Sequence, residues 1–214
     1  MSQQVTIQTI IDHPIVPVFF HNNAEISLNV FKACYAGGMR VFEFTNRGAN
    51  ALQTFKLLQE NLSNSEGYVL GAGTILSQNE AESFIEAGAS FIVSPCFIES
   101  VSDVCYQNKI PYMPGCMTVK EVHHSLQAGC EIIKVFPGDV VGAAFVKAVK
   151  AVLPDAQLMV TGGVSPNKES LASWFAAGVT AVGMGSNLFR KDWLETGNYK
   201  AVQESVANCF EYLQ

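Results

Sequence analysis

The sequence has few charged residues and no run of basic ones. Lysine and arginine together number 13, against 19 aspartates and glutamates, and the formal net charge is -6 over 214 residues. Charged residues make up 15% of the chain, whereas about a quarter is usual for soluble domains. Because polyanions are bound mainly by clustered positive charge, we expect no nucleic acid and no membrane surface as a partner.

Long apolar runs and paired cysteines are missing too. No apolar stretch approaches the roughly 18 residues of a membrane span, and the first ten residues lack the basic start and apolar core of a signal peptide. The six cysteines form no C-x-x-C pair, which is typical of reduced thiols in a cytoplasmic protein. The four histidines show no metal-ligand spacing. We therefore expect a cytoplasmic protein without a metal site.

The chain alternates between short strand-like runs and amphipathic helical stretches. About half of its residues are hydrophobic, which is enough for a sizeable core. A short helix is predicted before His13-Pro14, and each of eight later strands is followed by a helical stretch. Four of these helices end in a glycine signal. The predicted strands are Ile15–Phe20, Arg40–Thr45, Tyr68–Leu70, Phe91–Ser94, Pro111–Met113, the stretch Ile132–Pro137, Gln157–Val160 and Thr180–Gly183.

Eight consecutive βα units favour a closed barrel over an open doubly wound sheet. Alternating strands and helices imply a parallel sheet, and eight units in about 200 residues fit a closed barrel. An open doubly wound sheet would normally carry G-x-G-x-x-G after its first strand, where this chain has His21-Asn22-Asn23. No linker or low-complexity tract interrupts the pattern. We predict an α/β fold, a (β/α)8 TIM barrel with an N-terminal helix, as a single domain over residues 1–214.

The run I-I-K-V-F-P at 132–137 contains a single charge, Lys134. A lysine in a buried strand is costly and calls for an explanation. One interpretation is structural: the side chain reaches solvent or pairs with a carboxylate such as Glu131. The other is chemical: a neutral, partly desolvated amine forms a Schiff base with a carbonyl substrate. The stretch by itself favours the structural interpretation.

The alternation of side chains along the strands changes that balance. Glu43 and Thr45 share one face of their strand, while Phe42 and Phe44 point to the other. If the aromatic pair faces the helices, Glu43 points into the barrel, and the same argument turns Lys134 inward. A buried ion pair alone is weak evidence of stabilisation. We therefore predict that both residues are catalytic.

Glycine-rich segments follow the last two strands. Thr161-Gly162-Gly163 ends the seventh strand, and Gly183 to Ser186 ends the eighth. In (β/α)8 barrels the loops after these strands often hold a phosphate. Glycines let backbone N–H groups approach the anion, and a helix N-terminus favours its charge. Each segment alone is weak evidence, but together they predict a phosphate site.

An amine, a carboxylate and a phosphate site at one rim indicate a class I aldolase. The amine condenses with a ketone, and the protonated imine draws electrons from the adjacent C–C bond, which then breaks. The carboxylate moves protons during these steps. Arg47, with its planar guanidinium, is expected to bind a carboxylate of the substrate.

Several motifs, in this order, resemble the 2-keto-3-deoxy-6-phosphogluconate (KDPG) aldolase family, which includes the bifunctional 4-hydroxy-2-oxoglutarate aldolases. The resemblance runs from Ile15 to about Trp193. Some positions depart from the usual pattern, such as Asn46-Arg47-Gly48 after the second strand and Cys96 after S-P. The matching motifs are A-G-G-x-R-V-x-E-x-T (36–45), G-A-G-T (71–74), S-P (94–95), P-G-x-x-T (114–118), K-x-F-P (134–137), T-G-G-V (161–164) and G-S (185–186).

The resemblance implies a homotrimer that acts on a small phosphorylated keto acid without metal or other cofactor. It implies that Lys134 is the Schiff-base lysine and that Glu43 is the general acid/base. It further implies one set of residues for the substrate carboxylate, namely Arg47, Thr74 and Thr161. A second set would bind the phosphate, namely Gly162, Gly163, Gly185 and Ser186.

The expected reaction is cleavage of 2-dehydro-3-deoxy-6-phosphogluconate to pyruvate and glyceraldehyde 3-phosphate, with 4-hydroxy-2-oxoglutarate as a further substrate. Three alternatives stay open. The substrate can be the galactonate-series phosphate instead. A phosphosugar isomerase or epimerase would use the same loops without an imine. A barrel without catalytic activity would serve as a binding protein or scaffold.

Overall fold

A computed structural model describes residues 2–62 and 67–213 of the chain. Within these residues eight parallel strands pair in sequence order, and the last pairs with the first, so that the sheet closes into a barrel. This confirms the predicted (β/α)8 barrel. The strands are β1 (Ile15–Phe19), β2 (Val41–Thr45), β3 (Val69–Gly73), β4 (Ile92–Ser94), β5 (Tyr112–Cys116), β6 (Ile132–Val135), β7 (Gln157–Thr161) and β8 (Ala181–Met184).

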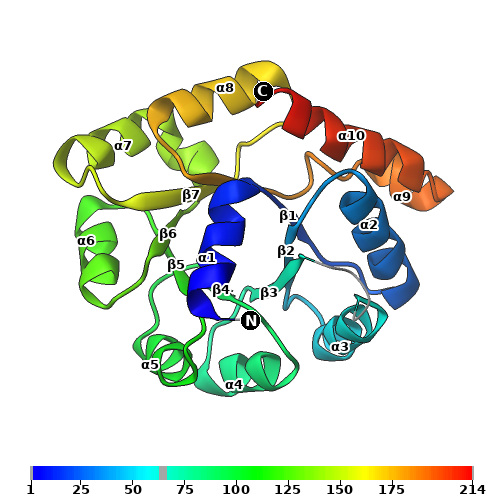
Figure 1. Ribbon diagram of the computed structural model, residues 1–214, viewed down its shortest axis with the longest axis horizontal. Helices are drawn as coiled ribbons and strands as arrows, with labels where there is room; N and C mark the ends of the chain where they lie inside the picture. Colours follow the sequence, from blue (N-terminus) through cyan, green and yellow to red (C-terminus); the bar gives the residue numbers. More distant parts are fainter. Residues whose placement is uncertain (1, 63–66, 214) are drawn as a thin grey trace.

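Helices surround the barrel and one more closes an end of it. Figure 1 shows the ring of helices outside the strands, with the N-terminal helix lying across the middle. The predicted N-terminal helix is thereby confirmed. The helices are α1 (Gln3–Asp12), α2 (Ala24–Ala36), α3 (Ala51–Leu62), α4 (Gln78–Glu86), α5 (Glu99–Asn108), α6 (Val119–Gln127), α7 (Gly138–Val152), α8 (Lys168–Ala177), α9 (Lys191–Thr196) and α10 (Tyr199–Glu211).

The apolar residues form two separate clusters because successive side chains of a strand point to opposite faces. The outer cluster fills the space between strands and helices and contains Phe42, Phe44 and Val135. The inner cluster fills the barrel and contains residues near the strand starts, together with Ile7 and Ile10 of α1. Helix α1 therefore seals the N-terminal end of the barrel, and the opposite end is left for a site.

Four predicted helix ends are found where the glycine signals stand. Gly38, Gly88, Gly129 and Gly178 follow α2, α4, α6 and α8, with φ angles of 98°, 93°, 85° and 100°. This left-handed conformation is easily adopted only by glycine, and it ends a helix. Each turn leads into the next strand of the barrel.

Strands β3 and β5 each end three residues later than the sequence predicted. Strand β3 continues to Gly73, and β5 continues through Pro114 to Cys116. In β3 a Cβ at Gly71 would overlap the ring of Phe91, so the absence of a side chain allows close packing. In β5 the proline lacks an N–H but keeps its carbonyl, and the strand stays paired with β4 at Ser94. The short helix α9 was not predicted.

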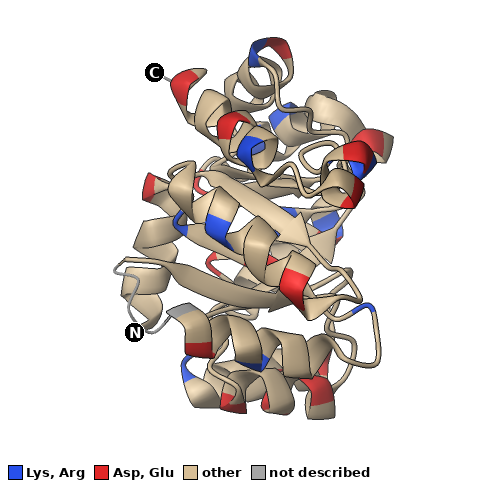
Figure 2. Ribbon diagram, turned by 90° about the vertical axis from the view of Figure 1, so that its right-hand side faces the viewer, with Lys and Arg blue, Asp and Glu red and all other residues tan. Residues whose placement is uncertain are grey.

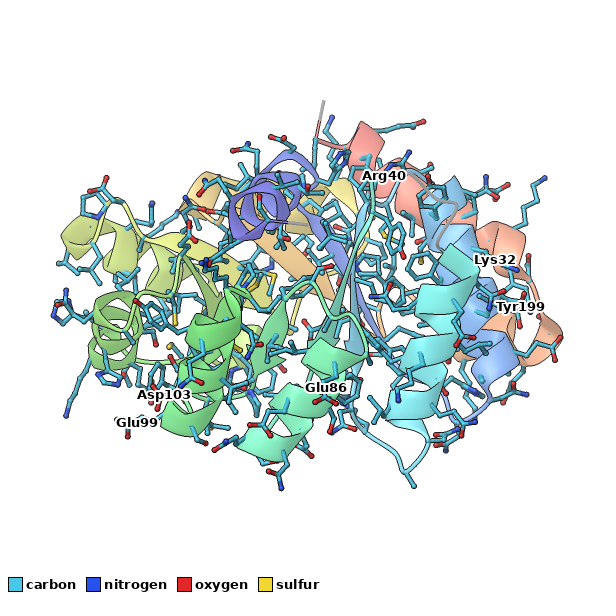
Figure 3. The ribbon with its side chains drawn as sticks, turned by 60° about the horizontal axis from the view of Figure 1, so that its bottom comes forward. Lys32, Arg40, Glu86, Glu99, Asp103 and Tyr199 are labelled. Atoms are coloured by element: carbon cyan, nitrogen blue, oxygen red, sulfur yellow. The ribbon has the colours of Figure 1, made fainter. Side chains whose placement is uncertain are left out.

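Charged residues lie mainly on the helices and loops, as the colours of the ribbon in Figure 2 show. Figure 3 shows Glu86 on α4 and Glu99 and Asp103 on α5 at the outside of the ring. All three side chains are exposed. Within the described parts of the chain no helix is both long and apolar enough to cross a membrane.

Candidate active site

Lys134 and Glu43 meet inside the barrel. The Lys134 Nζ lies 3.5 Å from Oε1 of Glu43, and the two side chains are only 7% and 1% exposed. They come from β6 and β2, on opposite sides of the closed sheet. The inner cluster contains Val41 and Ile132, which stand two residues before Glu43 and Lys134 on the same strands. This agrees with the predicted alternation of side chains. The structure therefore brings the two residues together as the sequence predicted.

Glu131 is not the partner of this lysine. Its Oε1 accepts a hydrogen bond from Nε2 of Gln3, at 2.9 Å, on the exposed side of α1. That contact lies at the N-terminal end of the barrel. The structural interpretation in which Lys134 pairs with Glu131 is wrong.

The carboxylate of Glu43 depends on Lys134 for compensation of its charge. Among residues 2–62 and 67–213, no donor makes a hydrogen bond to either of its oxygens. Its side chain leans towards the C-terminal end of β3, where a Cβ on Gly73 would overlap Oε1. Gly73 is thus required at this position because the carboxylate occupies the space of a side chain.

Phe136 connects the buried pair with the open end of the barrel. The Nζ of Lys134 lies 5.2 Å from the centroid of the Phe136 ring, which is within range of a cation–π interaction. The same ring lines a cavity at the C-terminal end of the barrel. Phe136 was not among the predicted site residues, although its position two residues after Lys134 was a usable signal.

The cavity at this end has a volume of about 440 Å³, which is the size of a small-molecule site. It lies where the active sites of (β/α)8 barrels are found. Of the described residues that line it, only Arg47 carries a charge, so the cavity favours an anion. Six of the predicted binding residues line it, namely Arg47, Thr161, Gly162, Gly163, Gly185 and Ser186.

The two glycine segments form one wall of the cavity. Gly162 and Gly163 have φ angles of 96° and 71°, which turn the chain sharply after β7. The Nδ2 of Asn187 donates a hydrogen bond to the carbonyl of Val164 at 3.0 Å, so the loops after β7 and β8 are joined. Asn187 also lines the cavity and was not among the predicted site residues. Backbone N–H groups in such loops are suited to bind a phosphate.

Thr161 and Thr74 differ in how they relate to the cavity. The Oγ1 of Thr161 is buried without a hydrogen-bond partner in the described chain, and a Cβ on the neighbouring Gly183 would overlap it. Thr161 therefore has a free polar atom at the wall of the cavity. Thr74 follows β3 in a left-handed conformation, with φ 60°, and does not line the cavity.

The structure is a (β/α)8 barrel with a small-molecule cavity at the C-terminal ends of its strands, and comparisons with known proteins give its family. Residues 7–205 match the aldolase family described as KDPG and KHG aldolase. KHG/KDPG aldolase of Escherichia coli (strain K12) is 32% identical over 203 residues, which cover 92% of this chain and 91% of that protein. The chain belongs to the KDPG and KHG aldolase family, and it is a lyase.

Two further comparisons bear on the substrate and the chemistry of relatives. The chain is 37% identical over 123 residues to 2-dehydro-3-deoxy-6-phosphogalactonate aldolase of Escherichia coli (strain K12), which cover 57% of this chain and 59% of that protein. KDPG aldolase from Legionella pneumophila, solved with pyruvate captured at low pH as a covalent carbinolamine intermediate, has a TM-score of 0.86 and 26% identity. The match covers 94% of this chain and 96% of that one. Membership of an aldolase family leaves the isomerase and scaffold alternatives without support.

Proposed function

We propose that this chain is a class I aldolase in which Lys134 forms a Schiff base with the keto carbon of the substrate. The observation that carries the proposal is the 3.5 Å contact between Lys134 and Glu43, buried in the barrel near a cavity suited to anions. An attacking amine must be neutral. Glu43 is the acceptor within reach for the proton that Lys134 gives up, so the pair supplies both nucleophile and base.

The reaction then follows from these two groups. The neutral amine adds to the C2 carbonyl, Glu43 returns its proton to the hydroxyl of the carbinolamine, and this hydroxyl leaves as water to give a protonated imine. Glu43 takes the proton of the C4 hydroxyl, the C3–C4 bond breaks, and its electron pair moves into an enamine. An aldehyde leaves. Glu43 returns this proton to C3 of the enamine, and water hydrolyses the imine, which releases pyruvate and restores the amine of Lys134.

Two groups of binding residues complete the proposal. Arg47, Thr74 and Thr161 hold the carboxylate of the keto acid, with the guanidinium of Arg47 supplying the positive charge. The turns of Gly162–Gly163 and Gly185–Ser186 hold the phosphate through backbone N–H groups and a hydroxyl. The cavity lined by Arg47, Thr161 and the two glycine turns supports their assignment, and Thr74 is included on the family resemblance.

The proposed substrate is 2-dehydro-3-deoxy-6-phosphogluconate, cleaved to pyruvate and glyceraldehyde 3-phosphate. We include 4-hydroxy-2-oxoglutarate, cleaved to pyruvate and glyoxylate, as a second substrate. The names of the relatives that align over most of the chain support both. The galactonate-series phosphate is the alternative, favoured by the relative with 37% identity.

Measured pyruvate release from each of the three keto acids tests this proposal. Wild-type protein is expected to release pyruvate from at least the gluconate-series phosphate. Glu43→Gln is expected to lower turnover by about 100-fold or more, because a positioned acid/base contributes this much. Glu131→Gln is the matched control and is expected to leave turnover unchanged. Equal turnover in Glu43→Gln and wild type would remove Glu43 from the proton-transfer role.

We also propose that the chain works as a homotrimer in the cytoplasm. The family resemblance supports the trimer, and the reduced-thiol composition supports the compartment. Light scattering on the purified protein is expected to give about three times the chain mass of 23.2 kDa. A mass equal to that of one chain would contradict the trimer.

A further inference from the structure

Glu80 makes contacts to two different loops. It is the third residue of α4, and its Oε2 accepts hydrogen bonds from the backbone N–H groups of Leu76 and Ser77, at 2.7 and 3.1 Å. The Ser77 hydroxyl in turn accepts from the N–H of Glu80, which completes a capping box. The second oxygen, Oε1, is not used by the box. It accepts a hydrogen bond at 3.0 Å from Nδ2 of Asn46, in the loop after β2.

Asn46 stands directly before Arg47. Its backbone N–H donates to the carbonyl of Gly73, at 2.8 Å, so it continues the pairing of β2 with β3. The N–H of Arg47 donates to the carbonyl of Thr45 at 3.0 Å, and the chain turns there. The bond from Asn46 to Glu80 thus joins the loop that carries Arg47 to the loop that carries Thr74.

The position of Arg47 depends on its backbone. The side chain is exposed, and within the described residues no carboxylate pairs with its guanidinium. Without such a partner, the position of the Arg47 side chain is set by the conformation of the loop that carries it. The contact between Asn46 and Glu80 is one residue away, and both side chains are half-buried. It is thus a side-chain anchor on the β3 side of the loop, one residue from Arg47.

The capping box of α6 shows that the bridge is not a general consequence of capping. There Oε2 of Glu121 accepts from the N–H groups of Met117 and Thr118, both at 2.9 Å, and from the Thr118 hydroxyl. All three donors belong to the segment that Glu121 caps. The two boxes share their local geometry, but of the two glutamates only Glu80 also accepts a hydrogen bond from another loop of the described chain, the one after β2.

We propose that Asn46 and Glu80 are positioning residues, whose hydrogen bond sets Arg47 relative to Thr74 and thereby tunes affinity for the carboxylate of the keto acid. The inference rests on the proposed function, because it takes Arg47 and Thr74 as the carboxylate site. Neither residue touches the reacting atoms. Loss of the bond is therefore expected to weaken keto-acid binding and to leave the chemistry at Lys134 intact.

The experiment measures the rate of borohydride trapping of pyruvate as a function of pyruvate concentration. Asn46→Ala removes the donor, and Asn46→Asp places a carboxylate against Glu80. Both are expected to raise the half-saturating pyruvate concentration by about tenfold, the range of one hydrogen bond to a charged group. The trapping rate at saturation is expected to stay at the wild-type value.

A reversal of the bond separates this role from a merely structural one. In Asn46→Asp combined with Glu80→Gln, the amide introduced at position 80 can donate to the carboxylate introduced at position 46. The pair keeps the original net charge, and wild-type half-saturation is expected to return. Glu80→Gln is not expected to rescue Asn46→Ala, which offers no partner.

Glu121→Ala serves as the matched control for Glu80→Ala, because each removes a capping box and only the second removes the bridge. Both are expected to lower thermal stability, and only Glu80→Ala is expected to raise half-saturation. Equal half-saturation in wild type, Asn46→Ala and Asn46→Asp, or equal effects of the two capping variants, would overturn the inference. If wild type itself yields no trapped adduct, the proposed function fails, and this inference fails with it.

Discussion

The pairing of Lys134 with Glu43 predicts a large and asymmetric effect on stability. Lys134→Met removes the positive charge and keeps the length of the side chain, which leaves Glu43 buried without a partner. At 3.5 Å the attraction amounts to about 5 kcal/mol with an effective dielectric constant of about 20. Breaking a buried pair from one side costs about 3–5 kcal/mol. The melting temperature is thus expected to fall by about 6–20 °C for a chain of this size.

Removal of both charges should lower the stability much less than Lys134→Met does. In Lys134→Met combined with Glu43→Gln no ion has to be desolvated, and replacing a buried pair by uncharged groups is often close to neutral. Lys191→Met is the matched control, because Lys191 also lies 3.5 Å from a glutamate, Glu195, but on the surface. Such an exposed pair contributes little, and no measurable shift of the transition is expected.

Urea unfolding followed by circular dichroism measures these differences as shifts of the midpoint. The order of stability is expected to be wild type, then the double variant, then Lys134→Met. If Lys134→Met is as stable as wild type, or if the double variant is the least stable, then Glu43 is not a buried charge that depends on Lys134. The site would then need a different electrostatic account.

Three further predictions concern other parts of the site and core. Gly73→Ala is expected to displace the carboxylate of Glu43, lowering turnover in the pyruvate assay and costing about 1–3 kcal/mol in urea unfolding. Ser186→Ala is expected to raise KM several-fold for the phosphorylated keto acid and to leave KM for 4-hydroxy-2-oxoglutarate unchanged, in steady-state assays. Burial raises the pKa of the Cys116 thiol to about 11 and of three other thiols to about 12. Stability is therefore expected to fall in urea unfolding as the pH rises above about 9, where thiols ionise in the unfolded chain only. The three thiols whose pKa is raised to about 12 are those of Cys105, Cys130 and Cys209.

Much of the site could be predicted because it follows from the periodicity of the strands. The alternation around Lys134 and Glu43 predicted that both point inward, and the structure agrees. The glycines after the last two strands were predicted to form one phosphate site, and they line one cavity. These features depend on strand parity and strand order, which a sequence records directly.

Other features could not be predicted because they depend on distances between elements. The space that Gly73 leaves for Glu43 requires the register of β2 on β3, which the sequence does not give. The bond from Asn46 to Glu80 joins residues 34 positions apart, and no local pattern indicates it. The strand through Pro114 was missed because proline usually interrupts a central strand.

The identity of the nucleophile is the central claim, and covalent trapping tests it most directly. The protein is incubated with pyruvate, reduced with borohydride, digested and weighed by mass spectrometry. One reduced pyruvate is expected on the peptide that contains Lys134, and none in Lys134→Ala. An adduct on another lysine, or intact protein without an adduct, would contradict it.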